Sequence, residues 1–594
     1  MFKLLSCKSA GAKVSGLTRL SFAMASIFAT SVSFSQALPP SSGSLLQTIP
    51  APKPVQQSQS IDLLDERLQN TKAMTDVEGM KIEIKSFKIT GLTVISPDQL
   101  VPVVNKFVGP NKKFQDLLDA SAAIRRELAR RGYFLADAVI PKQKIENGVV
   151  EILVVEGRIG KVRVQFDKDV VINQSLVMSY LSTLQTGAVI TAKDVERALF
   201  LISDLRGISA RSVFVPGEKI GSADLVVRVS KTKGYDGSLD FDTNGSQYTG
   251  LFRGGVTYNI NNPFHRGDLI SVNYLKSLDG GLHALSIGGD LVNTGDQDYR
   301  RITYLTPIGE LGSKLGISYS QLHYQLGTPT FDPVAASGDA TVASFMAVQP
   351  IVRSRNANFM ITYQYDDRKF HDAQMAYGYV ADKETKVYSL AYSGDLRDSA
   401  FGGGINVGNF VVTSGGLDIK QPDIRLSDHT SGLNSQGSYK KVNFTYSRLQ
   451  QLNRSSALYY SYTQQAASKN MDSSEKISLG GPGGVRAYPQ GEGSGDEGYV
   501  STVELRYSLP KSDTLAGDRT FVVFYDFAWS RNNKDSSSQN PSVDTSLKGI
   551  GAGLNWDTQG WSMKSSLAWR QTQPATSESY SPSPRVYFQL SKKL

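Results

Sequence analysis

Cysteine is almost absent from this chain of 594 residues, and the single one, Cys7, lies close to the N-terminus. Four basic residues in the same segment precede an apolar stretch over residues 20–34, and Ser35-Gln36-Ala37 then offers a small-x-small cleavage site. This pattern is typical of a secretory signal peptide, which we place at residues 1–37. The mature chain would enter an oxidising compartment without any disulfide, so its stability must come from a large core or a closed sheet.

Long apolar runs and catalytic motifs are also missing. No stretch is long enough for a transmembrane helix, and no G-x-S-x-G motif or P-loop occurs. The five histidines are scattered and show no metal-ligand spacing: His265, His283, His323, His371 and His429. We therefore expect no enzyme, no metal and no cofactor.

The excess of basic over acidic residues in this chain is modest. The formal net charge is +9, and the four basic residues of the predicted signal account for four of these charges, without any acid in that segment. For so long a chain this indicates a slightly basic, solvated surface rather than a nucleic-acid partner.

After the predicted signal peptide comes a linker over residues 38–80, which is rich in Pro, Ser and Gln. Within it, Ser60 as an N-cap and an apolar stripe predict a helix over 60–75. The stripe consists of Ile61, Leu64 and Leu68.

Two segments of similar organisation follow. Residues 81–159 read as strand, helix, helix, strand, strand, with "SFKITG" as the first strand and Asn147-Gly148 as the turn of a hairpin. Residues 160–231 repeat that order, and Thr191 with Asp194 three residues later begins one of their helices. Two tandem α+β modules are the natural interpretation, with one larger α+β domain as the alternative.

From residue 232 to the end, strands of about ten residues alternate with turns rich in Gly, Asn and Asp. In "NFMITYQYD" and "FVVFYDFAWS" aromatic side chains fall on one face. In the second stretch, every second residue from Phe521 to Trp529 faces outward, and Asp526, which lies between two of them, is on the opposite, inner face. Because no helix covers either face for some 360 residues, we expect a transmembrane antiparallel β-barrel of about 16 strands. A water-soluble solenoid or propeller would show a short internal period, which is not found.

One loop among these strands carries a specific motif. The stretch "SLGGPGGVRAYPQGEGSGDEGY" continues into a strand and not into a helix, which excludes a phosphate-binding loop. It resembles the hallmark loop of the TpsB transporters of two-partner secretion, the haemolysin secretion/activation family. The family's tetrad is matched by Val485, Arg486, Ala487 and Tyr488. "DFDTNGSQYTGLFRGG", "NNPFHRGD" and "FYDFAW" also fall in the family's order, and the resemblance spans essentially the whole mature chain.

The resemblance implies how this loop is placed. The α+β modules would be periplasmic polypeptide-transport-associated (POTRA) domains, helix 60–75 would plug the pore, and the loop over about 476–498 would fold back into the barrel. Arg486 would meet an acidic residue of a late strand, and the inner face of Asp526 makes it the partner. Gly480, Gly481, Gly483 and Gly484 would act as hinges that let the backbone turn back.

The function implied is export of an unfolded exoprotein across the outer membrane of a Gram-negative bacterium, without nucleotide hydrolysis. The partners would be a secreted TpsA-like protein (a haemolysin or an adhesin), outer-membrane lipid, and the barrel-assembly machinery during biogenesis. An outer-membrane barrel-assembly factor is the alternative, and a passive porin would not need the modules at 81–231. The family usually ends in an aromatic residue, whereas this chain ends in Leu594.

Overall fold

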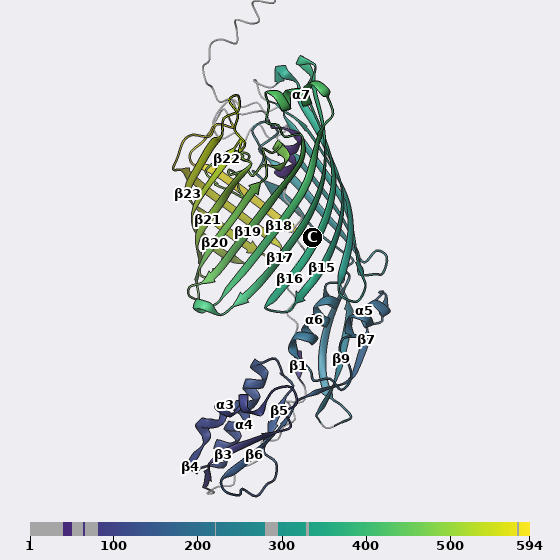
Figure 1. The fold of residues 1–594 in the computed structure, drawn as a ribbon, viewed down its shortest axis with the longest axis vertical. Coiled ribbons are helices and arrows are strands. Elements are labelled where there is room, and N and C mark those ends of the chain that lie inside the picture. The colour runs from purple at the N-terminus through teal and green to yellow at the C-terminus, as the bar shows by residue number, and fades with distance from the viewer. Residues whose placement is uncertain are drawn as a thin grey trace, which may run out of the picture.

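A closed barrel and two small α+β modules make up the computed structural model (Figure 1). The structure describes residues 40–49, 63–65, 81–219, 221–278, 295–327, 332–578 and 581–594. The two modules follow one another below the barrel, and the second lies directly against its rim. The predicted architecture, two α+β modules followed by an antiparallel barrel, is confirmed.

The first module covers its sheets with helices in the predicted order. Its elements are β2 (Ile82–Ile84), β3 (Ser86–Thr90), α3 (Val101–Val104), β4 (Gly109–Lys112), α4 (Phe114–Arg130), β5 (Asp137–Val139) and β6 (Val149–Val155). The sheet order is β3-β6-β5, with β2 and β4 paired separately. Leu117, Ile124 and Leu128 recur at helical spacing along α4 and are buried against Val150 and Ile152 of β6. One apolar stripe on α4 therefore closes this core.

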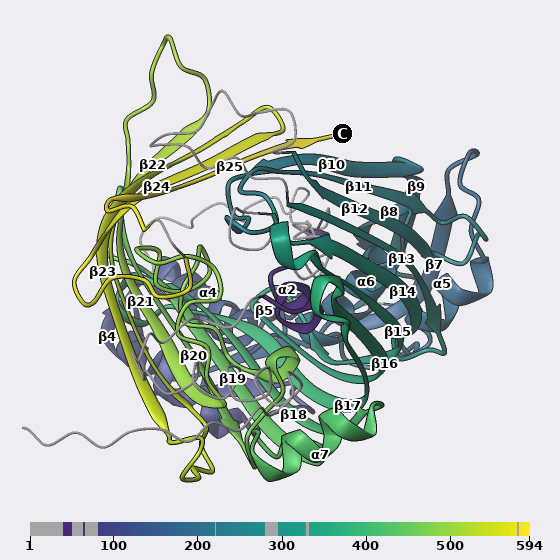
Figure 2. The same ribbon diagram turned by 90° about the horizontal axis from the view of Figure 1, so that it is seen from above.

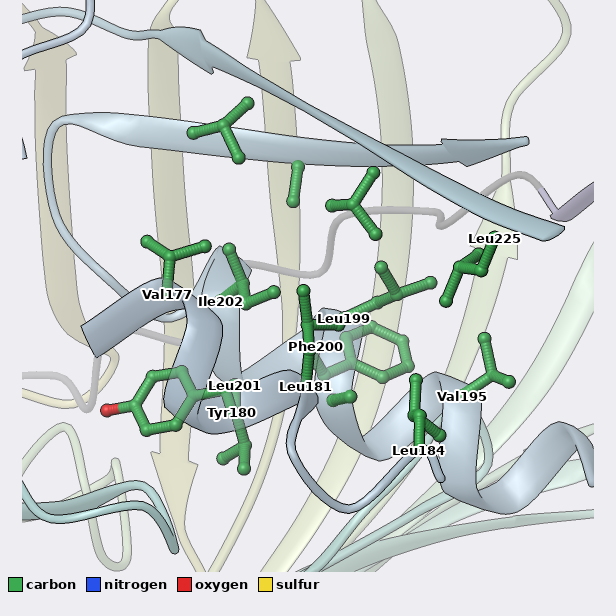
Figure 3. Packing of buried hydrophobic residues seen from close by; sticks show 14 of the residues in the cluster. Val177, Tyr180, Leu181, Leu184, Val195, Leu199, Phe200, Leu201, Ile202 and Leu225 are labelled. Carbon is green, nitrogen blue, oxygen red and sulfur yellow. The ribbon is translucent and has the colours of Figure 1, made fainter. Parts of the chain in front are cut away.

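The second module has the same order and a larger core. Its elements are β7 (Arg158–Phe166), α5 (Gln174–Leu181), α6 (Ala192–Ser203), β8 (Ile208–Pro216) and β9 (Ser222–Lys231). The Thr191 side chain accepts a hydrogen bond from the Asp194 N–H at 3.2 Å, which caps α6. Figure 3 shows Val177, Phe200 and Leu225 packed together between the helices and the sheet.

The linker contributes a strand to this second module. Residues Leu63–Asp65 (β1) pair in parallel with β8, so that the sheet order becomes β1-β8-β9-β7. The prediction of a helix over 60–75 is therefore wrong at these three residues, including Leu64; Ile61 and Leu68 lie outside the described residues. The edge of β8 supplies backbone partners from a second element, and this outweighs the local helical pattern.

Sixteen antiparallel strands, β10 to β25, close the barrel within the described residues. They are Tyr235–Asp242, Arg253–Asn261, Leu269–Ser277, Asp296–Ile308, Ser313–Gln325, Ala336–Arg353, Ala357–Gln374, Tyr379–Asp398, Gly404–Ile419, Gly437–Gln451, Ser456–Ala467, Glu497–Ser508, Asp518–Asn532, Val543–Thr558, Trp561–Arg570 and Arg585–Lys593. β25 returns to pair with β10. Every strand thus has two neighbours, so that the barrel has no open edge.

The two faces of the barrel differ as the alternation predicts. Phe359, Leu505 and Phe521 are exposed on the outer face, whereas Asp526 is fully buried on the inner face. The inner face of β22 (Asp518–Asn532) also carries buried Val522 and Phe524, which is unusual for a water-filled lumen. They are buried because the loop after β20 (Ser456–Ala467) packs on them from inside.

A short helix also lies inside the ring of strands. Figure 2 shows α2 (Ser42–Gln47) in the lumen, where Leu45 is buried among side chains of β13 to β16. A capping box formed by Ser41 and Ser44 begins this helix. A further short helix, α7 (Pro422–Thr430), lies at the end of the barrel far from the modules. Among the described residues, no helix is both long and apolar enough to cross a membrane.

Candidate functional site

The loop between β20 and β21 (Glu497–Ser508) fills part of the lumen. Val485, Ala487 and Tyr488 of its tip are completely shielded from solvent. Val485 packs in one cluster with Val522 and Phe524 of β22 and Leu547 of β23 (Val543–Thr558). Apolar contacts therefore hold the tip against one side of the inner wall.

The glycines before the tip allow the chain to reverse in this narrow space. Gly481 has φ +108°, a conformation that L-residues with side chains rarely adopt. A Cβ atom on Gly480 would meet the carbonyl oxygen of Pro489 at 2.3 Å, and one on Gly484 would meet that of Leu479 at 2.1 Å. A Cβ on Gly483 would find open space. Three of the four glycines are thus required by the turn itself, and Gly483 is not.

The structure brings Arg486 and Asp526 together. Arg486 Nε donates to Asp526 Oδ2 at 2.9 Å, and Nη2 donates to Oδ1 at 2.8 Å, a fork-to-fork arrangement. The backbone N–H of Arg486 donates to the same carboxylate at 3.1 Å, and so does the hydroxyl of Thr502 at 2.9 Å. The Asp526 carboxylate is therefore fully engaged although it is completely buried.

A second acid and an aromatic ring complete the surroundings of Arg486. Its Nη1 donates to Glu504 Oε1 at 2.8 Å, and the guanidinium carbon lies 3.4 Å from the centre of the Phe524 ring. Glu504 in turn accepts a hydrogen bond from Arg506. Sequence reasoning identified Asp526 and not Glu504, although the alternation of β21 places Glu504 on the same inner face. Arg486 thus joins the loop to two strands at once.

Tyr488 ties the tip to the last extracellular loop. Its hydroxyl lies 2.8 Å from the carbonyl oxygen of Gln573, to which it donates, and its own carbonyl accepts from Tyr587 at 2.8 Å. Glu492, further along the loop, accepts hydrogen bonds from the N–H groups of Thr576 and Ser577 at 3.0 and 2.9 Å. The loop over 571–584 therefore also holds the tip, a contact that no sequence pattern indicated.

The first part of the loop, just after β20, is held by a separate group of charges, which we name the upper latch: Asp472 and Glu475 with Arg368, Lys383 and Lys441. Glu475 is 2% exposed in its side chain and contacts Arg368 at 2.9 Å and Lys441 at 2.7 Å. Asp472 pairs with Lys383 at 2.6 Å. These basic residues come from β16 (Ala357–Gln374), β17 (Tyr379–Asp398) and β19 (Gly437–Gln451). The predicted loop begins at 476, so both acids were missed.

Helix α2 packs on this same part of the loop. The Ser41 and Ser473 hydroxyls lie 2.8 Å apart, and the N–H of Ser42 donates to Asp372 Oδ1 of β16 at 2.7 Å. A Cβ atom on Gly43 would come within 2.7 Å of Ser474 Cβ, so only glycine allows this close approach. The helix and the loop therefore touch each other as well as the wall.

The chemistry of the site is that of non-covalent closure. Within the described ranges, no group of three or more His, Cys, Asp or Glu side chains could hold a metal ion. The lumen contains buried ion pairs, hydrogen bonds and small apolar contacts, which can be broken and re-formed without chemical reaction. Such an arrangement is suited to a pore that is closed by a loop and a helix able to move.

Comparison with known proteins is informative once this geometry is established. A family model described as "Haemolysin secretion/activation protein ShlB/FhaC/HecB" matches residues 221–556, and a ShlB-type POTRA domain model matches residues 82–157. The chain is 26% identical over 467 residues to the heme/hemopexin transporter protein HuxB of Haemophilus influenzae, covering 78% of each chain.

Two solved structures show the same fold. CdiB from Escherichia coli aligns with a TM-score of 0.63 at 19% identity, covering 88% of this chain and 92% of CdiB. BamA from Haemophilus ducreyi, lacking POTRA domains 1–3, aligns with a TM-score of 0.52 at 14% identity, covering 86% of this chain and 100% of that one. At these identities the two likenesses establish the fold and not the role of any residue.

Proposed function

Because the chain belongs to the haemolysin secretion/activation family ShlB/FhaC/HecB and is an outer-membrane transporter of two-partner secretion, we propose that it exports one unfolded exoprotein through its own lumen. In this proposal the POTRA domains take up the exoprotein in the periplasm, and the loop tip and α2 close the pore at rest. The observation that carries it is the fork between Arg486 and Asp526, which holds the loop inside the barrel by non-covalent contacts alone.

Strand addition is the mode of uptake that we propose for the modules. Backbone hydrogen bonds to a sheet edge require little side-chain specificity, which suits a long unfolded substrate. The pairing of Leu63–Asp65 with β8 supports this mode, because an extended segment of the chain itself occupies that edge in the structure. An exoprotein strand would either displace β1 from β8 or use the outer edge of β7.

Opening of the pore would require both the loop tip and α2 to leave the lumen. We propose α2, and not the segment over 60–75, as the plug helix. The contact between Ser41 and Ser473 supports joint movement, because α2 cannot shift without changing the packing of the loop. The chain shows no nucleotide-binding motif, so folding of the exoprotein outside the cell would bias the direction of transport.

The cargo that we propose is a TpsA-like protein, a haemolysin or an adhesin. The test compares the culture supernatant and the outer membrane of cells with and without this protein. We expect one large secreted protein to disappear while other barrels stay at normal levels. Broad loss of outer-membrane barrels would instead support an assembly factor, and an unchanged supernatant would contradict export.

A further inference from the structure

Part of the second POTRA domain lies beneath the membrane and not beneath the pore. In the view from above, α5 projects sideways beyond the ring of strands, next to the ends of β7 and β9 (Figure 2). Figure 1 places the same helix just below the rim of the barrel. The barrel spans the outer membrane, so whatever projects sideways at this height faces lipid headgroups.

Two hydrogen bonds fix the height of this region against the barrel. The N–H of Asn173, the N-cap of α5, donates to the carbonyl oxygen of His265 at 2.8 Å. The side-chain amide of Asn262 donates to the carbonyl oxygen of Val171 at 2.7 Å. His265 and Asn262 belong to the turn over 262–268 between β11 (Arg253–Asn261) and β12 (Leu269–Ser277). The start of α5 therefore sits at the level of this periplasmic turn.

The turn itself reaches the lipid-facing surface. Phe264 packs edge-on against Tyr304 of β13 (Asp296–Ile308), with ring centres 5.7 Å apart. The residue opposite Tyr304 on the next strand is Ile317, which is 58% exposed and so belongs to the outer face. Aromatic pairs of this kind mark the boundary between lipid and water in membrane proteins. The turn over 262–268 thus lies at the periplasmic edge of the bilayer.

Apolar side chains are exposed on the turn over 262–268, just before α5 and on α5 itself. Val171 is 56% exposed, Met178 47% and Phe264 59%, and we name these three residues the overhang surface. Met178 is exposed because Val177 and Leu181 occupy the side of α5 that enters the domain core (Figure 3). A patch of large apolar side chains on an otherwise polar periplasmic domain indicates a partner.

The charges around the patch do not favour a strongly charged partner. Lys168 and Arg266 are exposed here, but Asp167 and Asp169 lie on either side of Lys168. The signs are mixed, so the apolar side chains must supply most of the contact energy. This composition fits the interfacial zone of a phospholipid leaflet, into which apolar side chains insert while charged ones stay at the headgroups.

We propose that the overhang surface contacts the inner leaflet of the outer membrane and anchors the second POTRA domain to lipid as well as to the barrel. The partner is a phospholipid surface, and the contact goes beyond the transport function proposed above. It would restrict the second domain to small movements, while the first domain, which Figure 1 shows further from the barrel, would stay free to meet the exoprotein.

Site-directed fluorescence can test this with the full chain reconstituted in vesicles of phosphatidylethanolamine and phosphatidylglycerol. The single cysteine, Cys7, lies in the predicted signal peptide, so Val171→Cys or Met178→Cys is the one labelling site of the mature chain and carries an environment-sensitive dye. The matched controls are Ile302→Cys on the outer face of β13, 53% exposed, and Val139→Cys on β5 of the first domain, 39% exposed. Each sample is measured with and without a lipid that carries a nitroxide quencher just below its headgroup.

We expect the quencher lipid to reduce the fluorescence of the labels at 171 and 178, as it reduces that of the label at 302. We also expect the labels at 171 and 178 to emit at shorter wavelength than the label at 139. The label at 139 should not respond. If the labels at 171 and 178 behave like the label at 139, the overhang surface faces water and the proposal is wrong. Because no exoprotein is added, failure of this test would leave the proposed transport function untouched.

Discussion

At the scale of single residues, Arg486 is the point on which the position of the loop depends. Its guanidinium lies between two acids and one ring, and each of these partners is buried on the inner wall. Removing one partner of such a group costs about 3–5 kcal/mol, because the remaining charges stay buried without compensation.

We therefore expect Arg486→Ala to leave the barrel in the outer membrane but to abolish most export. Loss of the exoprotein from the supernatant, with normal amounts of barrel in the membrane, would show this. Arg531→Ala is the matched control, since Arg531 pairs with Asp544 at the exposed end of β22. Such exposed pairs contribute about 0–1 kcal/mol. Normal export by Arg486→Ala would mean that the loop is only structural.

Glu475 makes a second residue-scale prediction. Glu475→Gln keeps the shape of the side chain but leaves Arg368 and Lys441 opposite an uncharged amide. We expect the first part of the loop, just after β20, to become mobile and the conductance in planar bilayers to rise. Glu384→Gln is the control, because Glu384 pairs with the half-exposed Lys420. Equal conductance of both variants would show that the upper latch does not restrain the loop.

The two groups of charges differ in how far sequence reasoning could reach them. Asp526 could be predicted because the family resemblance implies an acidic partner on a late strand, and strand alternation places Asp526 on the inner face. Glu475 could not, because its partners lie on strands 34 and 107 residues away. No local periodicity reports such contacts, which depend on how the loop fills the lumen.

At the scale of elements, the sequence does not indicate the short helix α2, and the helix that it predicts over 60–75 is contradicted at Leu63–Asp65. Six residues in a Ser-rich and Pro-rich segment show no measurable helical period. The helix exists because its contacts with the wall and with Ser473 and Ser474 stabilise it. Conversely, Leu63–Asp65 has helical spacing but pairs with β8. Tertiary contacts decide both cases.

Gly43→Val should displace α2 and raise conductance. A side chain at this position would overlap with Ser474, which is held in place by its neighbours Asp472 and Glu475. Gly408→Ala is the matched control, because a Cβ atom there meets nothing within 4 Å. Single-channel recordings of both variants would decide the question. A Gly43→Val channel as closed as the Gly408→Ala channel would show that α2 is no plug.

At the scale of the whole molecule, the barrel and the two modules could be predicted, but their arrangement could not. Alternating strands without covering helices left a closed barrel as the solution. The seat of the second domain on the rim depends instead on isolated contacts. Asp204 accepts from Arg353 at 2.7 and 2.9 Å, and Arg197 donates to the carbonyl oxygen of Ile351 at 2.9 Å. These residues carry no pattern that distinguishes them from other surface charges.

Asp204→Ala should loosen the second domain from the barrel and reduce export without affecting insertion. Arg353 would keep its charge against the Phe200 ring but lose its bidentate partner. Spin labels at Glu218 and Asn453, both exposed, would report a broader distance distribution. Asp169→Ala, an exposed acid of the same domain, should leave the distribution unchanged. An equally narrow distribution in Asp204→Ala would show that other contacts suffice.

The unequal lengths of the barrel strands have a further consequence. β15 to β18 contain 16 to 20 residues each, whereas β10 to β12 contain 8 or 9, and β24 and β25 contain 10 and 9. Since about ten residues suffice to cross a bilayer, the long strands rise above the cell surface and carry α7 at their top (Figure 1). The extracellular rim of the barrel is therefore slanted, high at β15 to β18 and low at β10 to β12. A polypeptide leaving the lumen would pass the low side of the rim first while it still contacts the high side. It would therefore leave the barrel toward the low side and not straight along the barrel axis.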